Sequence, residues 1–278
     1  MFYLYLILSV IAIPVLNNFF AIFGESYSWW LVPVLLVGIF LGFIILHALV
    51  FFISFGVTSL NSSQDKGAKY FRFLAVITVP LIVKLARVQV RLSGIDPEDV
   101  PKDKRMLFVC NHQHDFDPVI MLSVFGDREI GFIGKKEIFE KMGIIGKIMH
   151  KLYGLPVDRE NNREGAKSII KAINIIKQDK ASIGLFPEGY TNKGDGVLPL
   201  RNGSLKIAYK ANAPIVVCTL NGTRQIPKRM FRRKTVVDFC VNEVIYPEDF
   251  KDLSTAQLGD KIHSQMLETL QKMKKDEK

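Results

Sequence analysis

The chain has 278 residues, a formal net charge of +10, a hydrophobic content of 49% and a positive mean hydropathy of +0.19, values that are unusual for a soluble globular protein. Residues 1–60 contain no lysine or arginine and a single acid, Glu25, which leaves a net charge of +11 for the rest of the chain. This asymmetry excludes an ordinary soluble domain at the N-terminus and predicts a basic body that is attracted to anionic headgroups or phosphates.

Two apolar stretches occupy the N-terminal part, Phe2–Phe23 and Trp29–Leu60. The second exceeds the ~20 residues that a membrane-spanning helix needs, so it is predicted to be one. Pro14 and the Asn17–Asn18 pair interrupt the first, for which a spanning, a tilted and a re-entrant helix all stay open. Together the two stretches predict a transmembrane helical hairpin over residues 1–60.

The basic residues that follow the hairpin indicate its orientation. Lys66, Lys69 and Arg72 follow the second stretch closely, and basic residues favour the cytoplasmic side of a membrane. Trp29 and Trp30 stand where aromatic side chains mark a membrane interface. The protein is therefore expected to be integral to the cell membrane, with its body on the cytoplasmic face.

A third apolar stretch, Phe71–Val90, contains Pro80, which is expected to break it, together with Lys84 and Arg87. Helices lying in the interface plane, with basic side chains reaching for headgroups, are predicted over residues 61–90. A buried core helix is the alternative.

From residue 91 onward short apolar runs alternate with helical periodicity, which predicts one α/β domain over residues 91–278 with helices on both faces of its sheet. Amphipathic helices are predicted over Arg163–Gln178 and Ser254–Lys274. The expected strands, the first of which precedes this boundary, are Val88–Leu92, Met106–Cys110, Ile130–Ile133, Leu155–Val157, Ser182–Phe186, Ile215–Leu220 and Thr235–Val241.

The three cysteines, Cys110, Cys218 and Cys240, each lie in an apolar stretch without C-x-x-C spacing. Buried, reduced thiols are the expected state, which suits a cytosolic location and excludes a disulfide framework.

The second predicted strand ends in a cluster of imidazoles and carboxylates, from Asn111 through His112, His114, Asp115 and Asp117. A histidine titrates near neutral pH and suits a general base for an alcohol, and a carboxylate on its far nitrogen fixes its tautomer. Asp117 follows His112 by five residues, close enough to fold back across a tight turn, and Pro118 would then begin the next helix.

Two other interpretations of this cluster stay open. His112-x-His114 with nearby aspartates is a spacing that binds metals in several hydrolases, although the chain has only five histidines and the others show no ligand motif. A purely structural polar turn is the second.

A further predicted strand runs into Pro187-Glu188-Gly189, about 70 residues after the Asn-His-x4-Asp pattern of Asn111–Asp117. In combination the two motifs resemble the glycerolipid acyltransferase family, which includes 1-acylglycerol-3-phosphate acyltransferases. Gly154–Arg159 and Asn212–Val217 are similar to two further blocks of that family, and all four stand in the family's order between Val88 and Pro247.

The resemblance implies a mixed α/β sheet flanked by helices and an O-acyltransferase of phospholipid synthesis. It assigns His112 and Asp117 as a catalytic dyad that lets the acceptor hydroxyl attack the thioester of acyl-CoA or acyl-carrier protein directly. No acyl-enzyme and no cofactor are implied. Glu188 and Gly189 match the block that positions the acceptor, for which 1-acylglycerol-3-phosphate is favoured and another lysophospholipid is the alternative.

One block departs from the family's commonest pattern, because Glu-Gly-Thr-Arg is replaced by Glu188-Gly189-Tyr190-Thr191. An arginine suited to binding an acceptor phosphate in a bidentate manner is therefore missing. Arg159 and Lys135 are predicted to line the substrate site with these four residues, and Lys136 and Arg201 also flank the blocks.

Two function classes compete with the enzyme: a catalytically silent lipid-binding protein on the same scaffold, and a metal-dependent hydrolase. The basic run 228–234 contains two apolar residues, which favours an anionic-lipid patch over a solvated loop or a nucleic-acid contact. Membrane lipids and acyl-CoA or acyl-carrier protein are therefore the expected partners, without nucleic acid. The oligomeric state is not predicted.

Overall fold

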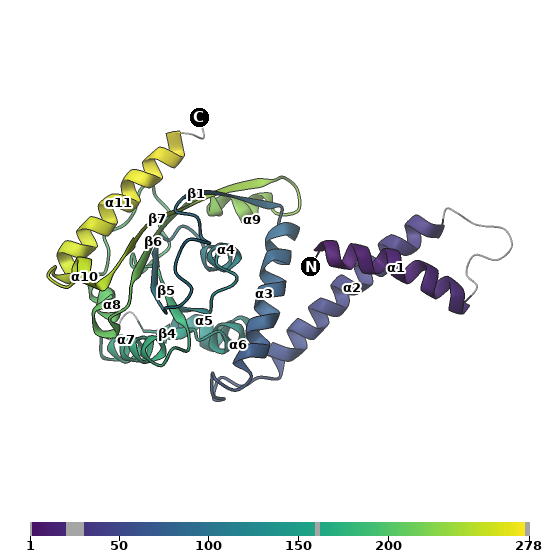
Figure 1. Cartoon of the computed structure of the whole chain (residues 1–278), viewed down its shortest axis with the longest axis horizontal. Coiled ribbons are helices and arrows are strands. Elements are labelled where there is room, and N and C mark those ends of the chain that lie inside the picture. Colours follow the sequence, from purple (N-terminus) through teal and green to yellow (C-terminus); the bar gives the residue numbers. More distant parts are fainter. Residues whose placement is uncertain (1, 21–30, 159–161, 276–278) are drawn as a thin grey trace. The chain divides into compact units, whose positions relative to one another are not determined.

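The computed structural model describes residues 2–20, 31–158 and 162–275, and it divides into two compact units, Met1–Thr58 and Ser59–Lys278 (Figure 1). The helices are α1 (Phe2–Phe20), α2 (Leu31–Gly56), α3 (Ala68–Leu85), α4 (Asp117–Val124), α5 (Lys136–Lys141), α6 (Ile144–Lys151), α7 (Asn162–Lys177), α8 (Lys206–Ala211), α9 (Ile226–Arg229), α10 (Pro247–Phe250) and α11 (Thr255–Lys275), with short 3₁₀ turns η1 (Asn202–Leu205) and η2 (Thr223–Gln225). The strands are β1 (Val88–Gly94), β2 (Leu107–Cys110), β3 (Ile130–Lys135), β4 (Leu155–Val157), β5 (Ser182–Leu185), β6 (Ile215–Asn221) and β7 (Thr235–Ile245).

The N-terminal unit consists of two packed apolar helices. The Tyr5 hydroxyl lies 2.7 Å from Nδ1 of His47, which pairs a polar group of α1 with one of α2. Helix α2 has 26 residues, a length of about 39 Å, and is long and apolar enough to cross a bilayer. The shorter apolar stretch of α1 is Tyr3–Asn18. A membrane location therefore rests on the length and composition of α2, and the orientation of the hairpin stays a prediction. Trp29 and Trp30 lie outside the described residues.

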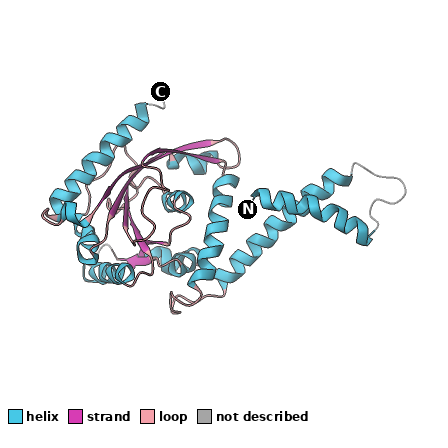
Figure 2. Cartoon of the chain, in the orientation of Figure 1, coloured by secondary structure: helices cyan, strands magenta, loops and turns pink. Residues whose placement is uncertain are grey.

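The larger unit is built on a seven-stranded sheet in the order β1-β7-β6-β2-β5-β3-β4, with helices on both of its faces (Figure 2). Neighbouring strands are parallel except for β6 and β7, which are antiparallel. The predicted mixed α/β sheet flanked by helices is thereby confirmed. Strand β2 lies between β5 and β6, so the carboxyl ends of these three strands meet at one edge of the sheet, where α/β folds place their ligands.

Successive side chains of the central strands point to opposite faces of the sheet, and each face has its own hydrophobic core. Leu107 and Val109 of β2 pack with α7, α8 and α11, while Phe108 and Cys110 point to the opposite face and pack with α3 and α4. Because both faces are covered, every residue of β2 is buried, which explains why it reads as a continuous apolar run.

Helix α3 differs from its prediction. It runs unbroken from Ala68 to Leu85 with Pro80 inside, although an internal proline removes a hydrogen bond and costs about 3 kcal/mol. Burial of one side of the helix against the domain offsets this cost. The buried side chains are Phe71, Leu74, Ala75, Thr78 and Leu81. The opposite side stays apolar and exposed, through Tyr70, Phe73 and Val76 among others.

The segment between α2 and α3 is tied to the larger unit by polar contacts. The Lys151 ammonium, almost fully buried, donates to the carbonyl oxygens of Ser63 and Lys66 at 2.8 and 3.2 Å. Asp65 accepts hydrogen bonds from Tyr153 at 2.9 Å and Lys180 at 2.7 Å. The larger unit therefore begins near Ser59, about thirty residues before the expected start of the α/β domain.

Candidate active site

The site forms where β2 and β5 end side by side. His112 follows β2 after one residue, and the turn Phe186–Tyr190 follows β5 directly. Parallel pairing of the two strands brings these segments together, so that Oε1 of Glu188 accepts a hydrogen bond of 2.6 Å from the backbone N–H of His112. Two motifs about 70 residues apart in sequence thus share one edge of the sheet.

His112 and Asp117 are in direct contact. Nδ1 of His112 lies 2.8 Å from Oδ2 of Asp117, and the same oxygen accepts the backbone N–H groups of Gln113 at 2.6 Å and His114 at 2.9 Å. Asp117 is fully buried at the first position of α4, with Pro118 behind it as predicted. Because Nδ1 faces a carboxylate acceptor, the neutral ring carries its proton on Nδ1 and its lone pair on Nε2.

Aromatic stacking fixes the plane of the imidazole. The His112 ring stacks on Phe186 with centroids 4.4 Å apart and an interplanar angle of 22°, and Phe186 stacks in turn on Phe132 at 5.9 Å. Gly184 makes this stack possible, because a Cβ at that position would lie 2.4 Å from the Phe132 ring. The ring is held with 12% of its side chain exposed, enough to meet a substrate.

Glu188 holds the backbone of the site. Its second oxygen, Oε2, accepts the N–H of Leu198 at 2.7 Å, and the residue is only 3% exposed. Burial raises the pKa of the Glu188 carboxyl, an effect opposed by the two backbone N–H donors of His112 and Leu198. With one oxygen on the N–H of His112 and the other on the N–H of Leu198, Glu188 positions the loop that carries His112.

Strand β6 supports the loop that carries His112 from the other side. Asn111 donates to the carbonyl of Leu220 at 3.0 Å and accepts from its N–H at 2.8 Å, as a strand residue would. Gln113 accepts the N–H of Gly222 at 3.1 Å. These side-chain amide contacts hold Asn111 and Gln113, the residues on either side of His112, in place. The sequence does not reveal this role, because the partners lie 109 residues away.

Two cations lie beside Tyr190 at the rim of the site. The Arg201 guanidinium is 5.0 Å and the Lys135 ammonium 5.9 Å from the centroid of its ring. Gly189 has a positive φ of 77°, and a Cβ there would lie 2.7 Å from Nε of Arg201, so the glycine turn lets the guanidinium approach its backbone. Thr191 is half-buried next to this turn, and Arg159 lies outside the described residues.

Comparison with known proteins identifies the chemistry of this fold. Residues 91–221 match the family model described as Acyltransferase, a span that contains the dyad and the Glu188 turn. Residues 91–221 are therefore an acyltransferase domain. The resemblance to glycerolipid acyltransferases is confirmed, and the chain is an O-acyltransferase.

Named relatives come from several bacteria. The chain is 28% identical over 224 residues to the "Probable 1-acyl-sn-glycerol-3-phosphate acyltransferase" of Mycoplasma pneumoniae, covering 76% of this chain and 81% of that protein. It is 29% identical over 160 residues to the 1-acyl-sn-glycerol-3-phosphate acyltransferase of Bacillus subtilis, covering 58% and 76%. The crystal structure of the 1-acyl-sn-glycerophosphate acyltransferase of Thermotoga maritima shares the fold, with a TM-score of 0.60 at 21% identity over 83% of this chain and 89% of that one.

Cys110, which precedes the loop that carries His112, is not poised as a nucleophile. Cys110, Cys218 and Cys240 are all buried free thiols, as predicted. Burial raises the pKa of Cys110 well above its usual value, and the nearby thiol of Cys218 and the carboxylates of Asp117 and Glu188 raise it further. A thiol held in its neutral form is a poor nucleophile.

His114 takes a local structural position in the acyltransferase domain. Its Nδ1 accepts the N–H of Phe116 at 3.2 Å, and its ring stacks on Phe116. Within residues 2–20, 31–158 and 162–275, no group of three or more His, Cys, Asp or Glu side chains is arranged to hold a metal ion. Of the two histidines in this cluster, His112 is the one whose ring contacts the buried carboxylate of Asp117.

Proposed function

We propose that the chain transfers a fatty acyl group from acyl-CoA or acyl-carrier protein to the free hydroxyl of 1-acylglycerol-3-phosphate. The observation that carries the proposal is the 2.8 Å contact of His112 Nδ1 with buried Asp117, which leaves Nε2 of a partly exposed ring as the base. The names of the relatives from Mycoplasma pneumoniae and Bacillus subtilis support this acceptor.

The reaction needs one proton acceptor and one proton donor, and His112 supplies both. Nε2 takes the proton of the acceptor hydroxyl as its oxygen attacks the thioester carbonyl, so that a C–O bond forms. The tetrahedral intermediate collapses with cleavage of the C–S bond, and the imidazolium returns the proton to the leaving thiolate. Asp117 stabilises the imidazolium between these steps and keeps the ring in the required tautomer.

Recognition of the acceptor phosphate is assigned to the cations beside Tyr190. Arg201 and Lys135 lie on the ring, next to the turn where the family's usual arginine is replaced. A guanidinium offers a planar set of donors that suits a phosphate, and the aromatic ring holds it in place. Arg159, predicted for this role from the sequence, stays a second candidate because it follows Val157 by two residues, and Val157 pairs with Lys135 in the sheet.

A competition assay tests this acceptor. Detergent-purified chain receives one acyl donor and an equimolar mixture of lysophosphatidic acid, lysophosphatidylglycerol, lysophosphatidylethanolamine and lysophosphatidylcholine, and mass spectrometry quantifies the products. Preferential formation of phosphatidic acid supports the proposal. Preference for a lysophospholipid whose headgroup covers the phosphate contradicts the acceptor, and no acylated product from folded protein favours a lipid-binding role.

We predict that Arg201→Gln lowers kcat/KM for lysophosphatidic acid by about 10- to 100-fold, mainly through KM, since a hydrogen bond to a charged group is worth about 1.5–3 kcal/mol. The KM for the acyl donor should change little. Steady-state kinetics with each substrate varied in turn measures both constants.

Lys210→Gln is the matched control, because it removes an exposed positive charge on α8 away from the site. Arg201→Lys should recover part of the loss, as it keeps the charge without the planar fork. An acceptor KM that is the same in Arg201→Gln as in the wild type would place phosphate recognition elsewhere.

Attachment to the membrane is proposed to involve more than the N-terminal unit. Side chains on the outer side of α3 are apolar and exposed, and Phe231 within the basic run 228–234 is 69% exposed. Basic and apolar side chains together favour the surface of an anionic bilayer.

We therefore predict that a chain beginning at Ser59 still floats with anionic vesicles at low salt. Flotation should weaken in high salt, because exposed charges are screened beyond about 8–10 Å at ordinary ionic strength and at shorter distances when salt is added. Vesicles of phosphatidylcholine alone are the control. Recovery of the shortened protein in the unbound fraction with anionic vesicles at low salt would show that the first 58 residues supply all of the membrane affinity.

A further inference from the structure

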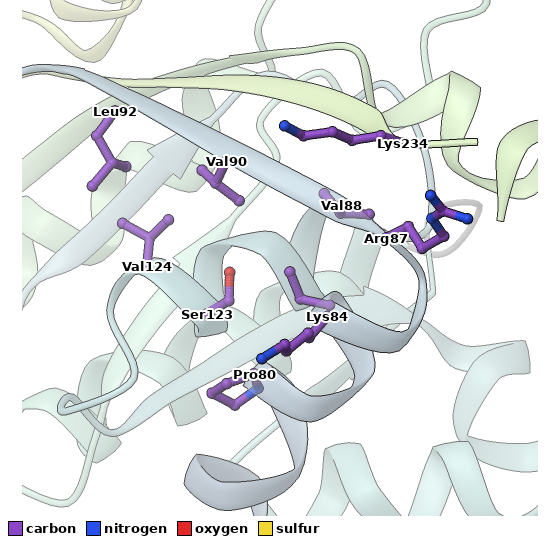
Figure 3. A pocket seen from close by; sticks show the side chains of 10 residues that line it. Pro80, Lys84, Arg87, Val88, Val90, Leu92, Ser123, Val124 and Lys234 are labelled. Carbon is purple, nitrogen blue, oxygen red and sulfur yellow. The ribbon is translucent and has the colours of Figure 1, made fainter. Parts of the chain in front are cut away.

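A groove lies apart from the His112 site, between α3, β1 and the end of α4 (Figure 3). The groove has a volume of about 540 Å³, within the range of small-molecule sites. Its wall is largely apolar and is formed by Pro80, Val83, Val88, Val90, Leu92 and Val124.

The groove exists because an apolar strand face is left partly uncovered. Strand β1 is the edge of the sheet, and Val88, Val90 and Leu92 alternate to one face while Arg91 points to the other and pairs with Asp238. Helix α4 has only eight residues and ends at Val124, so it does not cover the whole strand. Leu92 is consequently 54% exposed.

Three cations line the groove: Lys84 from the last turn of α3, Arg87, and Lys234 before β7. Arg87 and Lys234 are backbone neighbours, because Val88 pairs with Thr235 and the N–H of Thr235 donates to the carbonyl of Arg87 at 3.0 Å. Figure 3 shows both at the end of the groove opposite Leu92. Within the described part of the chain, no carboxylate oxygen lies within 4.0 Å of the charged groups of Arg87 or Lys234.

This cationic end lies at the same edge of the sheet as His112. Strands β1 and β7 begin where the antiparallel neighbour β6 and its partner β2 end. Strand β1 is three strands away from β2, about 14 Å at the usual spacing of roughly 4.8 Å. Asn221 at the end of β6 pairs with Asp238 of β7. The first three residues of β7, which begins at Thr235, therefore extend about 10 Å beyond that edge.

We propose that the groove binds an anionic phospholipid of the bilayer, with its phosphate at the end formed by Arg87 and Lys234 and an acyl chain along Val88–Leu92. An open groove with an apolar wall and a cationic end matches an amphiphile of opposite charge. A bilayer lipid is favoured because Pro80 is exposed and continues the apolar outer side of α3. The bound lipid would hold the edge that carries His112 at the membrane surface, where the acceptor resides.

Photolabelling of the full chain tests the site directly. The protein is placed in phosphatidylcholine nanodiscs that contain a small fraction of phosphatidylglycerol with a photoreactive group in one acyl chain, and crosslinked peptides are mapped by mass spectrometry. Crosslinks should concentrate on residues 80–92 and 123–124. A photoreactive phosphatidylcholine at the same content should label these residues at least tenfold less.

The double variant Arg87→Gln/Lys234→Gln should reduce labelling of the groove by about 30-fold at low phosphatidylglycerol content, since each basic residue near a surface contributes about fivefold. Leu92→Glu places a carboxylate in the apolar wall and should also abolish labelling, and its exposed position makes it compatible with folding. Lys171→Gln/Lys177→Gln on α7 is the matched control and should label as the wild type does.

Equal labelling in the double variant, or equal labelling by the phosphatidylcholine probe, would overturn the proposal. This test is independent of the proposed acceptor, since it measures no acyl transfer.

Discussion

Replacing His112 with alanine should lower kcat/KM for acyl transfer by at least about 10²–10⁴-fold, the usual contribution of a general base, while the protein stays folded and membrane-bound. The imidazole in contact with Asp117 is the proposed proton acceptor, and the Cys110 thiol is not poised to replace it, because it is buried with a raised pKa. Product formation at saturating substrate and the melting temperature are the two measurements.

His114→Ala is the matched control for this variant. His114 is two residues away, and its side chain contacts Phe116 and not the carboxylate of Asp117. Its removal should change kcat/KM less than about tenfold. Near-normal activity in His112→Ala, or an equal loss in both variants, would show that His112 is not the base.

Asp117→Asn should lower kcat/KM by a comparable factor, about 10²–10⁴-fold, and should also destabilise the fold by about 1–3 kcal/mol. Oδ2 of Asp117 accepts three hydrogen bonds, and Oδ1 is buried without a partner among the described residues. If the amide oxygen of the asparagine replaces Oδ2, its NH₂ group replaces Oδ1 and is buried without a partner. If the amide is flipped, its NH₂ group faces the backbone N–H groups of Gln113 and His114, which are donors themselves.

The loss in Asp117→Asn has a kinetic signature beyond destabilisation. An amide can orient the His112 ring but does not stabilise its charged form, so kcat should fall even where the variant is fully folded. Kinetics measured well below the melting temperature separate the two effects. A variant with lowered stability and wild-type kcat would restrict Asp117 to a structural role.

Local sequence signals were sufficient to predict the bounds of the strands and the contact between His112 and Asp117. All seven strands lie within about four residues of their predicted ends, since each is an apolar run bounded by turn-forming residues. The pairing of His112 with Asp117 was also predicted, because five residues and a following proline form a turn on their own. The order of the strands in the sheet was not predicted, because β1 pairs with β7, which lies about 150 residues later in the chain.

What sequence analysis missed depends on contacts across the sheet. Glu188 was predicted to position the acceptor, and the structure adds two contacts that the sequence did not show, with the backbone N–H groups of His112 and Leu198. Arg201 was noted only as a flanking cation, and its approach to Tyr190 depends on the turn at Gly189. Pro80 was expected to end a helix, and tertiary packing of α3 outweighs that local preference.

The central claim is acyl transfer to 1-acylglycerol-3-phosphate by the His112–Asp117 pair, and product analysis with isotopically labelled acyl donor tests it most directly. Purified full chain is incubated with lysophosphatidic acid and either labelled acyl-CoA or labelled acyl-carrier protein, and the products are analysed by mass spectrometry. The predicted result is phosphatidic acid with the label in its newly formed ester, with wild-type protein and not with His112→Ala. Release of labelled fatty acid without any labelled phosphatidic acid, from either donor, would contradict the account.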